Sequence, residues 1–430
     1  MPSELDLLRS LDDEPHTPST VDIRRAIADG RRRRIHRGVG YAGAATVTAL
    51  AVAGASVVAM SPHTPPRTTA GAAPTTASVA PEGEYTIPGT AGWSPAAATP
   101  PTRCALNRLP VPDGAPMALV TGADPTGRYL VGRSYPKPGS YQAVIWHDGE
   151  ARTVMLPGDL EESLQDVNST GTAVGWSYAE GGKPGTGPVP YVYRDGRVSK
   201  LPGVQRGNAY AINEAGAIVG DDDTGNAALV WPSETTEPIR LPLPAGASQG
   251  TARDIDEDGT TVGTIDNKRP YVWFPDGTHR ALPMPSLDGE RATTARVFHI
   301  RNGWAIGVAS DGLGRDGAAD PSSGRTGASA EYARAKAVRW NVRTGEVRVV
   351  GAFKGAADAV NAHGWQVGID GRGRAVLVAD ATTVALPALA SHQPGTLSTI
   401  ASTVSDDGRT IAGQSDDATG TIQAVVWRCR

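Results

Sequence analysis

One sequence pattern recurs seven times between residues 118 and 430, and it constrains the fold more than any other feature. The pattern is a turn of the form Ile/Val-Asn/Asp-x-x-Gly, a short apolar strand that ends in glycine, the segment Ala-x-x-Trp, and then Leu-Pro. Single copies depart from it, as the first does at Asp124-Pro125 and the fifth at Ile300 to Gly303. A period of about 40–45 residues with four short strands is typical of a β-propeller blade. The sequence therefore predicts an all-β, seven-bladed β-propeller of four-stranded blades. The strand-ending glycines of the copies are Gly132, Gly175, Gly220, Gly263, Gly307, Gly368 and Gly413.

We name the four expected strands of a blade A, B, C and D in chain order. In the clearest copy, residues 209–220, the turn between strands A and B runs from Asn213 to Gly216. Asparagine can bond the backbone of such a turn, and glycine readily takes positive φ. The pair Asp195-Gly196 likewise predicts a tight turn between strands C and D. The tight A–B and C–D turns are therefore expected at one end of the ring, the A–B end. The B–C and D–A loops are expected at the other, the B–C end.

Most tryptophans fall at one position of the repeat, the last residue of Ala-x-x-Trp in strand C. We interpret this position as a packing position between neighbouring blades, because large aromatic side chains bury much apolar area. Its residues are Trp146, Tyr193, Trp231, Trp273, Trp340, Val378 and Trp427.

The two ends of the repeat region predict how the ring closes. The seventh copy stops shortly after Trp427 and has no strand D, whereas the segment from Cys104 to Leu109-Pro110 resembles a strand D that precedes the first copy. If this N-terminal strand completes the last blade, the ring has no open edge. Cys104 and Cys429, the only cysteines of the chain, then lie on adjacent strands. Outside a membrane, such a pair predicts a disulfide bond.

The region before the ring divides into three segments of different composition. Residues 39–60 are uncharged and long enough to span a bilayer, which needs about 20 residues. Arginines are clustered at residues 31–37, and positive residues stay in the cytoplasm. We therefore expect a basic cytoplasmic tail at residues 1–38, a single-pass signal anchor at 39–60, and the propeller, residues 104–430, outside the cell. A secretory signal peptide cleaved near Ala55 or Ala59 is the alternative, although its basic region would be unusually long.

Residues 61–103 are rich in proline, threonine, alanine and serine, which predicts an extended extracellular stalk. The tail has two short segments that could form helices. It is either a docking peptide for a partner or a solvated segment whose arginines lie near anionic lipid.

The repeats resemble the bacterial extracellular repeat proteins known as the HAF family. The resemblance is carried by residues 211–220, 360–368 and 142–146, and it extends over roughly residues 104–430. It implies a secreted or surface-exposed propeller. It implies no defined chemistry and therefore no catalytic residues.

No catalytic, metal or cofactor site is predicted. Residues 254–259 have the Asp-x-Asp-x-Asp-Gly form of a calcium loop, but the twelfth position is Ile265, not glutamate, and the segment aligns with the other A–B turns. The sequence has no Walker-type loop and no His-Glu-x-x-His motif. The net charge of −4 also argues against a nucleic-acid partner, which needs a basic surface.

The B–C loops vary most in length, and variable loops on a rigid scaffold commonly carry binding residues. We therefore predict a ligand face at the B–C end. It combines aromatic residues of the first two copies, the acidic run of the third, and the long loop of the fifth, residues 308–335. The candidate residues are Tyr135, Tyr141, Trp176, Tyr178, Asp221, Asp222, Asp223, Arg315, Asp316 and Tyr332.

Three functions follow from this organisation. The first is a membrane-tethered extracellular binding or scaffold module whose ligand is an envelope protein or a glycan. The second is a glycan-acting hydrolase or lyase, which needs two carboxyl groups about 5–10 Å apart near the axis. The third is a transmembrane sensor that signals through the tail. The sequence leaves the ligand and the oligomeric state open.

Overall fold

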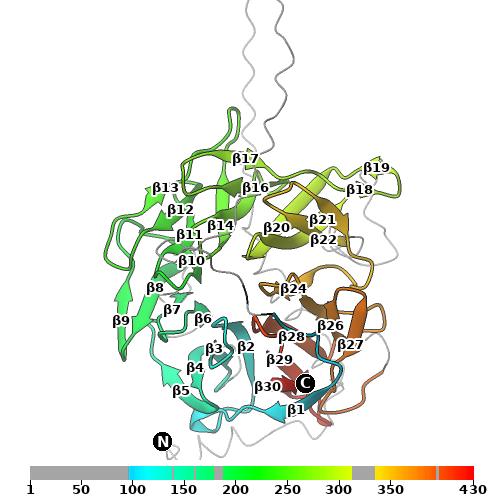
Figure 1. The fold of residues 1–430 in the computed structure, drawn as a ribbon. Coiled ribbons are helices and arrows are strands. Elements are labelled where there is room, and N and C mark those ends of the chain that lie inside the picture. The colour runs from blue at the N-terminus through cyan, green and yellow to red at the C-terminus, as the bar shows by residue number, and fades with distance from the viewer. Residues whose placement is uncertain are drawn as a thin grey trace, which may run out of the picture. The chain divides into compact units, whose positions relative to one another are not determined.

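The computed structural model describes residues 95, 97–137, 140–158, 161–178, 187–311, 335–393 and 397–430. These residues form seven four-stranded antiparallel sheets arranged around a common axis (Figure 1). The predicted all-β seven-bladed propeller is confirmed. The predicted tail, membrane anchor and most of the stalk lie outside the described residues. Within the described ranges, no helix is long and apolar enough to cross a membrane.

Strand A is the innermost strand of every blade, and strand B pairs with it. The A strands of blades 1 to 7 are β2 (Ala118–Ala123), β6 (Glu162–Val167), β10 (Gly207–Ile212), β14 (Gly250–Ile255), β20 (Thr294–Arg301), β24 (Ala357–Val360) and β28 (Thr399–Val404). The B strands are β3 (Tyr129–Ser134), β7 (Ala173–Ser177), β11 (Ile218–Asp222), β15 (Thr261–Ile265), β21 (Trp304–Ser310), β25 (Gln366–Ile369) and β29 (Thr410–Asp416).

Strands C and D complete each blade toward the rim. The C strands are β4 (Gln142–His147), β8 (Val189–Arg194), β12 (Ala227–Trp231), β16 (Arg269–Trp273), β22 (Lys336–Asn341), β26 (Ala375–Ala379) and β30 (Ile422–Cys429). The D strands are β5 (Glu150–Val154), β9 (Arg197–Lys200), β13 (Ile239–Arg240), β17 (His279–Ala281), β23 (Val347–Val349), β27 (Thr382–Ala385) and, for blade 7, β1 (Cys104–Arg108). A 3₁₀ turn, η1 (Pro112–Gly114), follows β1, and the hairpin of β18 (Ser286–Leu287) and β19 (Glu290–Arg291) lies between blades 4 and 5.

The N-terminal strand closes the ring as predicted. β1 pairs antiparallel with β30, and the pairing begins with Cys104 opposite Cys429. These two residues form a disulfide bond. The predicted closure and the predicted disulfide are therefore both confirmed.

The tryptophans of strand C join neighbouring blades by a hydrogen bond as well as by packing. Trp231 is fully buried, and its Nε1–H donates to the carbonyl oxygen of Pro202 in the preceding blade at 2.9 Å. Trp146 donates in the same way to Pro110, which follows the closing strand β1. Each Trp of the repeat thus bonds the Leu-Pro of the blade before it. The other three such pairs are Trp273 with Pro242, Trp340 with Pro283, and Trp427 with Pro387.

Every A strand carries one β-bulge, at the same place in all seven blades. In blade 4, the A–B register joins Ala252 to Gly263 and skips Arg253 before it resumes at Asp254. A bulge of this kind inserts one extra residue and bends the strand. It also brings the carbonyl oxygen of Thr251 close to strand B. A Cβ added at Gly263 would lie 1.9 Å from this oxygen. This close approach explains the glycine of strand B. The prediction that the strand ends there is wrong, because β15 continues past Gly263 to Ile265.

The chain reaches the ring at the A–B end. Pro101 is buried, and its Cδ would lie 3.5 Å from a Cβ added at Gly408, in the A–B turn of blade 7. Ala98 packs against the hydrophobic cluster that contains Trp365. The backbone N–H of Thr102 donates to the carbonyl oxygen of the C-terminal Arg430 at 3.0 Å. Residues 97–103 therefore contact the ring on the side opposite the B–C loops.

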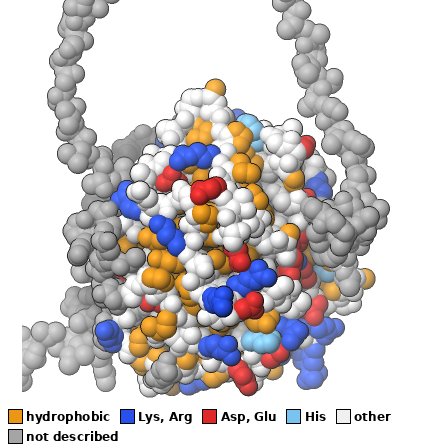
Figure 2. Space-filling view, turned by 90° about the vertical axis from the view of Figure 1, so that its left-hand side faces the viewer, with side chains coloured by type: hydrophobic (Ala, Val, Ile, Leu, Met, Phe, Trp, Pro, Cys, Tyr) orange, Lys and Arg blue, Asp and Glu red, His pale blue; other side chains and the backbone are white. Residues whose placement is uncertain are grey.

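Basic and acidic side chains are interspersed on the outer side of the ring. Figure 2 shows this mixture on the side where β9 lies, with apolar side chains scattered between the charges. The exposed large apolar residues, Met155, Ile239 and Val349, belong to or directly follow three different D strands. Charged residues along short outer strands also discourage edge-to-edge pairing with other chains.

Replacing both Cys104 and Cys429 by serine should lower the free energy of unfolding by about 5 kcal/mol, since the bond closes a very long loop. Urea denaturation of the full-length protein measures this difference. Wild-type protein in reductant should behave like the double variant. Equal midpoints for the oxidised wild type and the double variant would contradict a stabilising role of the disulfide.

Candidate ligand-binding site at the inner edge of the blades

The bulge residues line the inner edge of the ring, because strand A is innermost in every blade (Figure 1). All seven are half-buried, whereas the residue before each of them is a buried Ala, Val or Leu. No residue type occurs twice at the bulge. The repeat is thus uniform where blades pack and different in every copy at this position, as a rigid scaffold with a specific binding surface requires. The bulge residues are Thr121, Gln165, Tyr210, Arg253, Phe298, Asp358 and Ser402.

Two adjoining positions show the same variety. The first position lies two residues before the bulge in strand A. The second directly follows the glycine of strand B. The two residues face each other in the half of the blade nearer the B–C end. Among the six such pairs that the strand register defines, neither position repeats a residue type. The pairs are Leu119 with Arg133, Ser163 with Trp176, Asn208 with Asp221, Thr251 with Thr264, Arg296 with Val308, and Ile400 with Gln414.

The predicted aromatic residues form two clusters at the B–C end. In blade 1, the ring centroids of Tyr135 and Tyr141 lie 5.1 Å apart, edge to face. The guanidinium of Arg133 lies 4.9 Å from the Tyr141 centroid, and its Nε donates to the Tyr135 hydroxyl at 3.0 Å. In blade 2, Trp176 and Tyr178 meet edge to face at 5.7 Å. The aromatic rings are therefore held in fixed orientations. Trp176 is only 5% exposed, whereas the three tyrosines are half-buried and offer part of their surface for stacking against a ligand.

In blade 3, Asp221 connects strands A and B beside the bulge. Its Oδ1 accepts hydrogen bonds from the backbone N–H and the Nδ2 of Asn208, both at 3.0 Å. Its Oδ2 accepts from the Tyr210 hydroxyl at 2.8 Å, and the Arg253 guanidinium lies 4.1 Å from the Tyr210 ring centroid. Burial raises the pKa of Asp221, while the bonds from Asn208 and Tyr210 oppose that rise. Neighbouring bulge residues of blades 3 and 4 are thus in direct contact.

The other two residues of the acidic run have different environments. Asp222 Oδ2 bonds the guanidinium of Arg240, on the outer strand β13, at 2.7 Å. Asp223 directly follows strand β11 and is exposed. The run therefore places one carboxylate toward the inner edge, one toward the rim and one in solvent.

Three predicted residues, Arg315, Asp316 and Tyr332, lie outside the described residues. Their part in the predicted ligand face stays a prediction.

Glu162 is a buried acid at the B–C end that the sequence pattern did not single out. It begins strand β6, two residues before Leu164, and is 4% exposed. Its Oε2 accepts a hydrogen bond at 3.1 Å from the backbone N–H of Leu156, in the preceding blade. Burial raises the pKa of Glu162 to about 7, although the backbone hydrogen bonds lower it. Glu162 therefore joins blades 1 and 2 through a carboxyl group that titrates near neutral pH.

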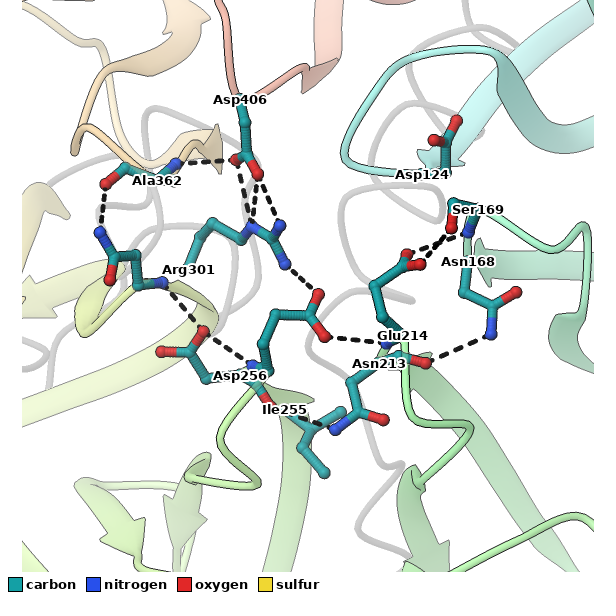
Figure 3. A network of polar contacts seen from close by, with 12 residues as sticks. Asp124, Asn168, Ser169, Asn213, Glu214, Ile255, Asp256, Arg301, Ala362 and Asp406 are labelled. Atoms are coloured by element: carbon teal, nitrogen blue, oxygen red, sulfur yellow. Dashed lines mark hydrogen bonds and ion pairs between the residues drawn. The ribbon is translucent and has the colours of Figure 1, made fainter. Parts of the chain in front are cut away.

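A polar network joins the A–B turns at the other end of the ring (Figure 3). The Nδ2 of Asn168 donates to the carbonyl of Asn213, and the Nδ2 of Asn213 donates to the carbonyl of Asp256, both at 3.3 Å. Arg301 bonds Glu257 of blade 4 and Asp406 of blade 7. In blades 2 to 6 the Asn or Asp of the turn bonds the next blade, so contact between blades explains this residue of the repeat as well as the geometry of its own turn does.

The calcium-like segment belongs to this network. Asp256 accepts hydrogen bonds from the backbone N–H groups of Asn302 and Gly303 at 2.9 and 2.7 Å. Its carboxylate is therefore engaged by the next blade. Across the described ranges, no three His, Cys, Asp or Glu side chains are grouped so that they could hold a metal ion.

Two further inner carboxylates also bond the next blade. Asp166 Oδ2 accepts from the backbone N–H of Ile212 at 2.9 Å, and Asp254 Oδ2 accepts from that of Ile300 at 2.8 Å. Burial and the charge of Asp254 raise the pKa of Asp166 well above its usual range. These acids connect blades, which is a structural use of the carboxyl groups that a glycan-acting enzyme would need.

The sequence pattern predicted the aromatic clusters but missed Arg133 and the bulge residues. A signal was present, because the residue types at the bulge differ in every copy while the residue directly before it is always Ala, Val or Leu. Recognising it requires knowing that strand A holds an extra residue.

Replacing Glu162 by glutamine should make unfolding less dependent on pH. The folded protein keeps a proton on Glu162 that the unfolded chain loses above its pKa of about 4.3, so stability falls as pH rises from there to about 7. The variant should match the wild type near pH 4 and exceed it by up to about 3 kcal/mol at pH 8. Denaturant titration at several pH values measures this. The exposed Glu150→Gln is the control, and a parallel pH profile for Glu162→Gln would contradict the assignment.

No protein-family model matches the sequence, and no curated protein matches it. Among solved structures, the chain is similar to a catalytically inactive virginiamycin B lyase from Staphylococcus aureus with quinupristin, at 12% identity and a TM-score of 0.48, covering 76% of this chain and 100% of that one. It is also similar to YCF48 bound to a D1 peptide, at 15% identity and a TM-score of 0.43, covering 78% and 99% of the two chains. These similarities concern the fold alone.

Proposed function

We propose that this chain is a membrane-tethered extracellular binding module of the cell envelope, with a protein or glycan ligand. Its single-pass anchor is residues 39–60, its tail 1–38 lies in the cytoplasm, and its propeller belongs to the HAF type of repeat protein. The ligand is bound at the B–C end and along the inner edge of the blades.

One observation carries the binding role: the bulge position and its two neighbours change in every copy of an otherwise uniform repeat. Packing alone does not require seven different side chains at equivalent places. The position directly before the bulge shows the alternative, since it is Ala, Val or Leu in every blade and is always buried. Variety confined to one edge of a rigid scaffold is what recognition of an asymmetric ligand needs.

The route of the chain supports the same orientation. Residues 97–103 contact the ring at the A–B end, beside Gly408 and Arg430. A ring tethered through these residues presents its B–C end away from the tether. The aromatic clusters around Arg133 and Trp176 then lie on the side that envelope components can approach.

Replacing Tyr141 or Tyr178 by alanine should weaken ligand binding at least about tenfold, as loss of an aromatic contact at a binding centre does. Full-length protein screened against glycan and peptide arrays, followed by titration of each hit, measures the effect. Met155→Ala, at a side chain that is 65% exposed on the rim, is the control. A ligand whose affinity falls in Met155→Ala but is unchanged in both tyrosine variants would contradict the proposed site.

Protein isolated from native membranes should retain its original N-terminus, because an uncleaved anchor keeps residues 1–38 attached. Mass spectrometry of the intact chain reads this end directly. A chain that starts near Ser56 or Met60 would show cleavage, and the protein would then be secreted and not tethered.

A further inference from the structure

We propose that Asp358, the bulge residue of blade 6, binds a positively charged amine of the ligand. This proposal rests on the proposed binding function and names the chemistry that one part of the site recognises. The group is an alkylammonium, as on a lysine side chain or an amino sugar, and not a metal ion.

The first observation is an unsatisfied oxygen. Oδ2 of Asp358 is buried and has no hydrogen-bond partner in the structure. The residue as a whole is half-buried at the inner edge of blade 6. Buried polar atoms in folded proteins nearly always have partners, and those that lack one are commonly functional. A carboxylate oxygen without a donor is therefore a place where a ligand donor gains a strong, charge-assisted bond.

The second observation is the contrast with the other inner carboxylates. Asp221 is bonded by Asn208 and Tyr210, and the Asp254 carboxylate accepts the backbone N–H groups of Ile255 and Ile300. Each of these acids thus has donors within the protein. Oδ2 of Asp358 does not, although leaving such a group unpaired costs on the order of 1–3 kcal/mol.

The flanking blades supply side chains that suit an ammonium group. The bulge residues before and after Asp358 in ring order are Phe298 and Ser402, both half-buried. Contact between neighbouring bulge residues is seen directly where Arg253 lies over Tyr210. An aromatic face attracts a cation, and a hydroxyl oxygen can accept one of its protons. A metal ion would need several carboxylate or carbonyl ligands, which this group does not provide.

No positively charged side chain among the described residues offsets the burial of Asp358, so the ligand has to supply the positive charge. Burial alone raises the pKa of Asp358 to about 7, and no charged side chain of the protein contributes to the shift. The carboxyl group is therefore about half ionised at neutral pH, and a bound cation stabilises the ionised form.

The test uses n-butylammonium chloride as the probe and n-butanol as its neutral analogue. Full-length protein in a non-ionic detergent is titrated by saturation-transfer NMR at constant ionic strength, at pH 8 and pH 5. The variants are Asp358→Asn and, as the control, Asp380→Asn, an exposed residue in the C–D turn of the same blade.

Wild type and Asp380→Asn should bind the ammonium at least about tenfold more tightly than the alcohol, and Asp358→Asn should lose this preference. Ammonium affinity of the wild type should also fall about 100-fold from pH 8 to pH 5, as the carboxyl group protonates. The pH series needs no variant, so it remains decisive even if Asp358→Asn folds poorly.

Equal binding of the two probes by the wild type, or ammonium binding that is unchanged by Asp358→Asn or by pH, would overturn the proposal. An array ligand that depends on Tyr141 and carries no amine would also overturn it, while the proposed function would stand. Amine binding at Asp358 without any ligand that depends on Tyr141 would support the Asp358 site and contradict the wider binding face.

Discussion

The close approach between the A-strand bulge and the B-strand glycine is the constraint on which the rest of the ring depends. In blade 4 the carbonyl of Thr251 occupies the space where any side chain at Gly263 would lie. The glycine accommodates the extra residue of strand A, and the extra residue is thereby released from strand pairing. Its side chain has no part in the ladder, so evolution can vary it without disturbing the blade.

The contacts between blades use the residues that the repeat keeps constant. At the outside, buried tryptophans bond the Leu-Pro carbonyl of the preceding blade, as Trp231 does with Pro202. At the A–B end, asparagine and aspartate side chains of the turns bond the next turn, as Asn213 does with Asp256. Both sets lie away from the bulge. Stability and recognition are therefore assigned to separate positions of one repeat, which allows a uniform ring to hold a varied inner edge.

The sequence predicted the features that each copy carries by itself. The period, the Leu-Pro that precedes the first copy, and Cys104 and Cys429 at the two ends were enough to predict seven blades and their closure. The polar contacts that join the turns of different copies were not predictable. Arg301 bonds Asp406 across blade 6, and nothing in either turn sequence links these two residues. The bulge was also missed, because one extra residue in a strand leaves the apolar alternation almost unchanged.

The position of the disulfide has a mechanical consequence. Tension on the chain ahead of the ring reaches β1 at its first residue, Cys104, which lies directly opposite Cys429. Without a covalent link, such a pull would peel β1 from β30 one hydrogen bond at a time, starting from this pair. The disulfide passes the load to β30, a strand in the interior of blade 7, so that a pull on the chain must disrupt the whole blade before it can open the ring.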